Sequence, residues 1–242
     1  MAVIGWSIAS NATVTSDPVQ QATLAEIYAG NEQSAPFAEN MLPSGTASSY
    51  NISDIGPQVV GTLAAQYAAL QQKGAYTPEV GAAVATQLAP SLKAPVSYKT
   101  FSIIDISTVS DTSHARMEKY QSDLLAALAP LSQNTTPEIS IFSAYTQTKD
   151  PKYLAELRAV AQYYTDATTA SAKVIVPQDA IAQHIAILNA MGQFSATLKG
   201  LADNADDPIA VMALLSTYND AELGMVISFN AFASYVTNHA RS

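Results

Sequence analysis

The fold is decided by the last long apolar stretch of the chain, residues 208–236, which reads PIAVMALLSTYNDAELGMVISFNAFASYV. Its apolar positions recur at alternating steps of four and three residues, which is the spacing of a heptad seam along one face of a helix. The positions of this seam are Val211, Leu215, Tyr218, Glu222, Met225, Phe229, Phe232 and Val236. The pattern predicts one long helix that packs against a neighbouring helix along the seam.

The neighbour is expected directly upstream, in a helix over about residues 177–202. Two apolar stripes run along this segment, and together they make a surface wide enough to indicate a central, buried helix. The stripes hold Ile181, His184, Leu188, Met191, Ser195 and Leu198, and then Ile187, Phe194 and Leu201. Because only a short turn around residues 203–208 joins the two helices, they are predicted to form a long antiparallel hairpin.

Outward from this hairpin, further helix starts are marked by a capping residue followed by Pro, as at Asp17-Pro18 and Asp150-Pro151. We therefore predict an all-α fold, a single bundle of about six or seven helices over residues 17–242. Residues 31–53 are rich in Ser, Asn, Pro and Gly and are expected to form a mobile loop. Residues 96–109 are β-prone, but no second strand run is evident, so an extended or irregular segment over the helices is expected.

The composition excludes several classes of function. The 242 residues carry a net charge of −9, which disfavours binding to nucleic acid or to an anionic membrane surface. There is no cysteine, so disulfides, thiolate metal sites and cysteine catalysis are excluded. Residues 1–16 are interpreted either as a tail that packs on the domain or as the stub of a membrane anchor ending near Trp6.

His184 is the first candidate for a functional residue, because it lies on an apolar stripe. In the predicted hairpin it would face roughly position 226, about one turn from Glu222, the charged residue of the seam. A hydrogen bond between the two side chains has two interpretations: an acid–base or ligand site that also includes Asn189 and Tyr218, or a buried polar pair that fixes the helix register. The second interpretation is favoured.

Metal and cofactor sites have weaker signals. Asp203, Asp206 and Asp207 form a small acidic cluster that is a candidate for Ca²⁺, but helix capping before Pro208 explains it more simply. The three histidines lack the paired spacing of zinc or di-iron sites. No nucleophile elbow, phosphate-binding loop or dinucleotide glycine pattern is present, so we expect no cofactor and no enzymatic activity.

Three stretches resemble a family of uncharacterised, all-helical, membrane-anchored exported proteins of candidate-phyla bacteria. They are residues 176–191, residues 206–218, and residues 104–111 followed by 117–120. The resemblance extends over about residues 95–240 and implies an exported helical domain at a cell surface. It carries no functional residue, because the family has no established activity.

These observations lead to two expectations about function. The first is a non-enzymatic, extracytoplasmic helical domain that acts by protein–protein contact or self-association, as part of a surface assembly. The alternative is a small-ligand binding or sensor bundle, with its site between the last two helices near His184 and Tyr218.

Overall fold

The structure is a computed structural model in which residue 52 and residues 55–82 and 92–239 are described. By its contacts the chain divides into residues 1–47 and 48–242, and all of the described residues belong to the second unit. The predicted tail or anchor stub at 1–16 lies outside the described residues, as does nearly all of the loop expected at 31–53. Within the described part, no helix is both long enough and apolar enough to cross a membrane.

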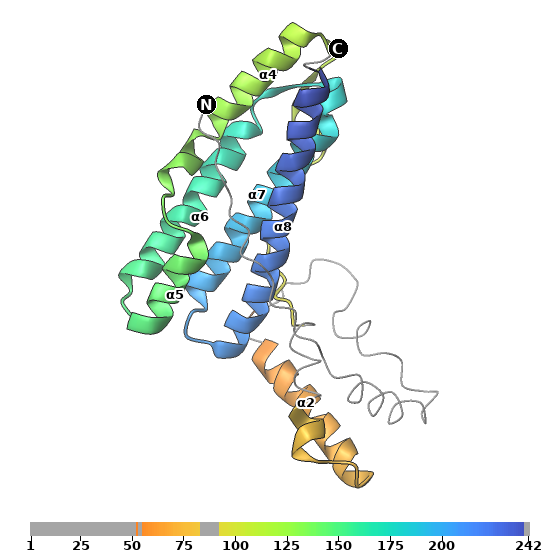
Figure 1. Ribbon diagram of the computed structural model, residues 1–242, viewed down its shortest axis with the longest axis vertical. Helices are drawn as coiled ribbons and strands as arrows, with labels where there is room; N and C mark the ends of the chain where they lie inside the picture. The colour runs from red at the N-terminus through yellow and green to blue at the C-terminus, as the bar shows by residue number, and fades with distance from the viewer. Residues whose placement is uncertain (1–51, 53–54, 83–91, 240–242) are drawn as a thin grey trace. The chain divides into compact units, whose positions relative to one another are not determined.

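The second unit is an all-α bundle, as predicted. Its helices follow the caps and apolar periods of the sequence, and Figure 1 shows those from α4 onward as rods joined by short connections. Their bounds are α2 (Ile55–Gln72), α4 (His114–Ala127), α5 (Glu138–Thr148), α6 (Lys152–Ser171), α7 (Ile181–Asp203) and α8 (Pro208–His239).

Helices α7 and α8 form the predicted antiparallel hairpin (Figure 1). The connection is short because Asp207 caps α8: its carboxylate accepts hydrogen bonds from the amides of Ile209 and Ala210. Helix α7 lies against both α6 and α8 and is the most buried helix of the bundle, as its two apolar stripes predicted. The large side chains that are fully buried include Leu188, Met191, Phe194 and Leu198 of α7.

The face that α8 turns toward the core differs from the predicted seam. Tyr218, Met225 and Phe232 of the seam are buried, but its other five positions are only half-buried. The buried face lies to one side and is built largely from small residues, among them Ala210, Ala213, Thr217, Ala221 and Ser228. Small side chains let two helices approach closely, and a pattern search that counts only large apolar residues misses them.

Residues 96–109 were wrongly expected to have no strand partner. Strand β1 (Ser107–Val109) pairs in parallel with β2 (Ile175–Pro177), and Thr108 lies opposite Val176. Arg116 of α4 adds a hydrogen bond from its guanidinium to the Ile175 carbonyl. This short ladder satisfies backbone groups at the start of α4 and just before α7.

Candidate functional site

His184 lies in the core and does not meet Glu222. Its Nδ1 is 3.0 Å from the hydroxyl of Tyr120 on α4, and the imidazole is 0% exposed. The Tyr120 ring also packs edge-on against Phe232 of α8, with the ring centroids 5.7 Å apart. The predicted His184–Glu222 pair is therefore wrong. The ring contact between Phe194 of α7 and Tyr218 of α8 shows how the two helices are aligned, and this alignment places His184 opposite a part of α8 that lies beyond the predicted position 226.

Burial determines the protonation state of His184. Removal of the ring from water lowers its pKa to about 4, and the nearby Ser171 carbonyl opposes this shift only in part. The imidazole is therefore neutral near pH 7. Within the described part of the chain, the buried Ser171 hydroxyl makes no hydrogen bond. A ligand would have to displace core side chains to reach this ring, which argues against a binding site here.

Asn189, the second residue of the predicted ligand set, has a structural task. Its side-chain oxygen accepts a hydrogen bond from the Phe101 amide at 2.6 Å, and its Nδ2 donates to the Phe101 carbonyl at 3.1 Å. Both polar ends of the amide are thus used by one peptide segment. Asn189 holds the segment before β1 onto α7 and is not free to hold a ligand.

Tyr218 and Glu222, the other two predicted residues, are neighbours one turn apart on α8. The Tyr218 hydroxyl donates to Glu222 Oε1 at 3.5 Å. Burial raises the pKa of the Glu222 carboxyl, and the negative charge of Glu138 raises it further. The sequence did not indicate that a second carboxylate lies near Glu222.

Glu138 is that second carboxylate, at the start of α5, and it is only 8% exposed. It accepts hydrogen bonds from the Tyr164 hydroxyl at 2.9 Å and from Asn134 Nδ2 at 2.8 Å. The Phe194 ring lies between the rings of Tyr164 and Tyr218, at 4.8 and 5.2 Å. Glu138 gave no signal beyond that of an acidic residue in a first helical turn, because its burial depends on how α5 and α6 pack.

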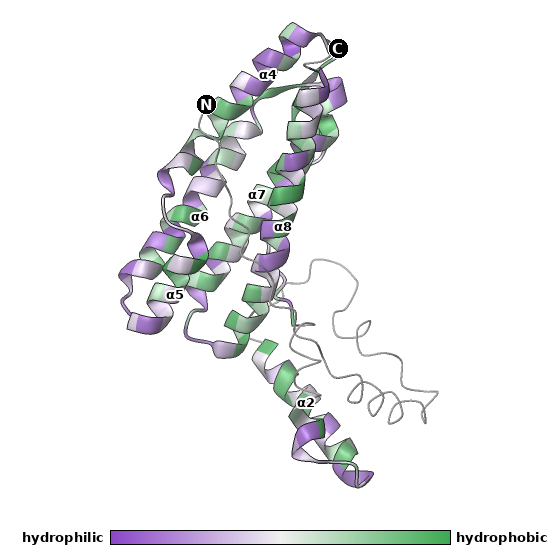
Figure 2. Ribbon diagram, in the orientation of Figure 1, coloured by the Kyte–Doolittle hydropathy of each residue, from purple (hydrophilic) through white to green (hydrophobic). Residues whose placement is uncertain are grey.

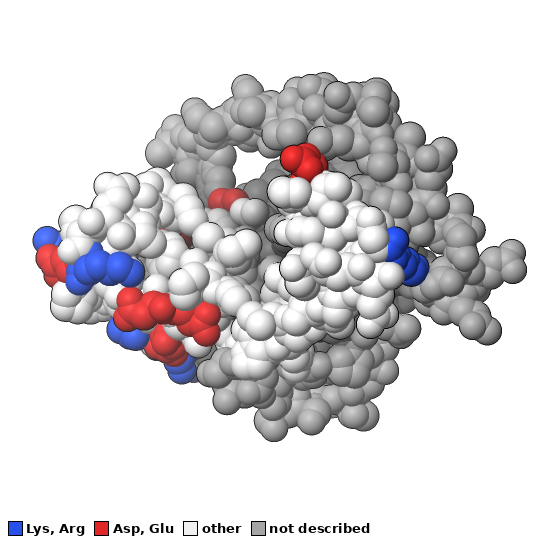
Figure 3. All heavy atoms as spheres, turned by 90° about the horizontal axis from the view of Figure 1, so that it is seen from below, with Lys and Arg blue, Asp and Glu red and all other residues white. Residues whose placement is uncertain are grey.

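The three aspartates of the α7–α8 turn do not converge on one point. Asp203 pairs with Arg158, Asp206 accepts a hydrogen bond from the Tyr145 hydroxyl, and Asp207 caps α8. Among the residues that the structure describes, no group of three or more His, Asp or Glu side chains is placed to hold one metal ion. The structure therefore gives the proposed Ca²⁺ site no support. In Figure 3 the charged side chains gather over the end of the bundle that holds α5 and α6.

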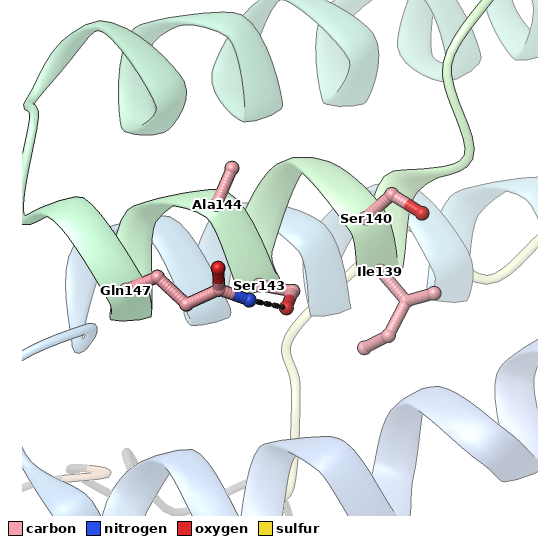
Figure 4. Close-up of a pocket in the computed structure, with 5 residues that line it drawn as sticks. All are labelled: Ile139, Ser140, Ser143, Ala144 and Gln147. Atoms are coloured by element: carbon pink, nitrogen blue, oxygen red, sulfur yellow. Dashed lines mark hydrogen bonds between the residues drawn. The ribbon is translucent and has the colours of Figure 1, made fainter.

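A shallow hollow of about 410 Å³ lies along the outer face of α5 (Figure 4). Its lining comes from this one helix and has no ionisable group. The lining residues are Ile139, Ser140, Ser143, Ala144 and Gln147, and Gln147 donates to the Ser143 hydroxyl at 3.0 Å. A catalytic cleft needs polar groups that converge from several elements, so this hollow is a poor candidate for chemistry.

The outer face of α8 is a different kind of candidate, because it is apolar and exposed. Leu223 is 58% exposed, Ile227 59% and Met212 50%, and hydrophobic segments recur along the helix in Figure 2. The residues directly opposite the core recur at steps of four and three and contain no charge. This outer stripe of α8 consists of Met212, Ser216, Asn219, Leu223, Val226, Asn230, Ala233 and Thr237.

An exposed helix face normally carries charged residues, and an uncharged one with large apolar side chains is typical of a contact surface. The heptad spacing of the outer stripe is present in the sequence, but the neighbouring seam has more apolar residues, and the prediction therefore considered only the seam. Comparison with protein families, with curated proteins and with solved structures found no match to this chain.

Proposed function

We propose that this chain is a non-enzymatic helical domain that acts by protein–protein contact, and that the outer stripe of α8 is its contact surface. The observation that carries the proposal is the exposure of Leu223, Val226 and Met212 on a stripe without charged residues. Burial of such side chains is the main source of favourable free energy in protein association.

The test is photocross-linking in the cells that express the protein. A photoreactive residue replaces Leu223, and the matched control carries it at Leu125 of α4, which is equally exposed at 59%. Cross-linked products from position 223 that are absent from position 125 support a contact surface on α8. A chain that gives no product from position 223 would rule the proposal out.

We also propose that the domain is exported and acts at a cell surface. Charged residues make up only 13% of the sequence, and this low share, together with the family resemblance of residues 95–240, supports this location. Protease added to intact cells should then degrade an epitope-tagged chain. Protection of the tag until the cells are lysed would contradict this location.

Small-ligand binding is the second candidate, at Tyr218 and Glu222 rather than at His184. Two carboxylates beside aromatic rings favour a cationic ligand such as a protonated amine. The supporting observation is geometric: Glu138 and Glu222 accept hydrogen bonds from Tyr164 and Tyr218, and both tyrosine rings contact the ring of Phe194. Thermal denaturation with a panel of small amines tests it. A stabilisation that is lost in Glu222→Gln and kept in Glu156→Gln supports binding, whereas no stabilisation by any amine argues against it.

A further inference from the structure

We propose that the outer stripe of α8 pairs with the same stripe of a second copy of this chain, with the two helices antiparallel. This inference rests on the proposed function and names the partner. A two-fold axis in such a pair would pass between Leu223 and Val226, so that one patch meets itself.

The stripe is self-complementary in this arrangement. Leu223 of one copy lies opposite Val226 of the other, and Asn219 lies opposite Asn230. Farther out, Ser216 meets Ala233 and Met212 meets Thr237, so apolar or small side chains face each other along the pair. An asparagine amide both donates and accepts, and polar residues at seam positions select the register of paired helices.

The neutral stripe permits contact with a second copy, and the charges beside it favour the antiparallel direction. Two copies, each with a net charge of −9, repel each other least when they meet through a neutral face, and the stripe is neutral. The nearest charges on α8 are Asp220 and Glu222, one on each side of the stripe. Asp220 is already paired with Lys93.

In the antiparallel pair, each side of the stripe meets the same side of the stripe on the second copy. Asp220 therefore comes near Ile227 of the second copy, and Glu222 comes near Phe229. Neither contact places two charges together. A parallel pair would bring Asp220 of one copy beside Glu222 of the other, which is unfavourable. Opposed helix dipoles add to the same preference.

The absence of cysteine from the chain makes the test direct. Asn219→Cys and Asn230→Cys are prepared separately, and each is oxidised mildly, alone and as an equal mixture. Antiparallel pairing places residue 219 opposite residue 230, whereas the two copies of residue 219 lie about 16 Å apart along the helices, too far for a disulfide. The mixture should therefore give at least about tenfold more disulfide dimer than either variant alone, because facing thiols react at a high effective concentration.

Two further variants link the cross-link to the stripe. Leu223→Lys added to both cysteine variants should abolish the cross-link, and Leu125→Lys should leave it unchanged. Circular dichroism checks that both variants are folded, as expected for substitutions at side chains that are more than half exposed.

The possible outcomes separate this inference from the proposed function. A cross-link that is stronger for Asn219→Cys alone than for the mixture indicates a parallel pair and overturns the inference. A yield no higher than that of Leu125→Cys means that the copies do not pair. If photoproducts from position 223 then contain a different protein, the proposed function stands and only the second-copy inference fails.

Discussion

The hydroxyl of Tyr120 lies 3.0 Å from Nδ1 of His184, and this contact joins α4 to α7 inside the core. Both side chains are 0% exposed, and burial raises the pKa of the Tyr120 hydroxyl far above its usual range. The two groups therefore remain neutral across the physiological range and form a hydrogen bond between uncharged partners.

The first prediction concerns acid stability. The folded pKa of His184 is about 4, below the ordinary value of 6.5, so the unfolded state binds the proton more readily. The stabilisation is present above pH 6.5 and is lost as the pH falls through the folded value. At about 1.4 kcal/mol per pH unit, the loss between pH 6.5 and 4 is on the order of 3 kcal/mol. Urea denaturation at several pH values measures it, and His184→Gln should flatten the dependence.

Histidine NMR titration provides a separate check on the identity of the partner. Glu222→Gln should leave the pKa of His184 unchanged, because the two side chains do not meet. A pKa of His184 near 6.5 that falls in the Glu222 variant would restore the ion pair that the sequence suggested.

The second prediction is that Tyr120→Phe destabilises the fold by about 1–3 kcal/mol, because it leaves Nδ1 of a buried histidine without a partner. Tyr163→Phe is the control, since the Tyr163 side chain is only half-buried. Urea denaturation measures both variants, and the midpoint of Tyr120→Phe should be the lower of the two. Equal midpoints would mean that the Tyr120–His184 contact contributes nothing.

The third prediction is that Glu222→Gln stabilises the protein at pH 7. Burial and the charge of Glu138 raise the pKa of Glu222, so ionisation of this carboxyl costs the folded state free energy. The cost appears as the pH rises through the ordinary value of 4.5, and the neutral amide avoids it. Thermal midpoints at pH 7 and pH 4 should differ less from wild type at the lower pH. Glu156→Gln, at an exposed position, should have no such effect.

The fourth prediction compares two glycines on the hairpin. A Cβ at Gly200 would lie 2.8 Å from Cδ2 of Leu214, a fully buried side chain, whereas a Cβ at Gly224 would meet nothing within 4 Å. We expect Gly200→Ala to destabilise the fold by about 1–2 kcal/mol and Gly224→Ala to stabilise it by up to about 1 kcal/mol. Chemical denaturation of both variants measures the difference, and the same sign for both would contradict the packing of α7 on α8.

The fifth prediction is that Asn189→Ala frees the segment before β1. The variant loses both hydrogen bonds to the Phe101 backbone, at a cost of about 1–3 kcal/mol. Hydrogen exchange of the Phe101 amide should become much faster, while amides in the middle of α6 keep their protection. Gln162→Ala, at an exposed position of α6, is the control that should leave the Phe101 amide unaffected.

The sequence was sufficient for the all-α class and the α7–α8 hairpin, because caps and apolar periods are local signals. It was insufficient for the face of α8, because Ala213 and Ala221 are buried without adding to a pattern of large side chains. It was also insufficient for the partner of His184. That partner is Tyr120 of α4, and the spacing of residues along α7 and α8 does not indicate which side chain of a third helix reaches the imidazole. The Glu138–Tyr164 contact depends on how α5 packs against α6, and no local sequence pattern indicates it.

The β1–β2 ladder has a consequence for the order of folding. It is three residues long, and the strands Ser107–Val109 and Ile175–Pro177 are separated in the chain by α4, α5 and α6. Closing so long a loop for so few hydrogen bonds is entropically unfavourable in the unfolded chain. We therefore expect the three helices to pack together first. The ladder should form last, when the bundle is nearly complete and its two strands are already close together.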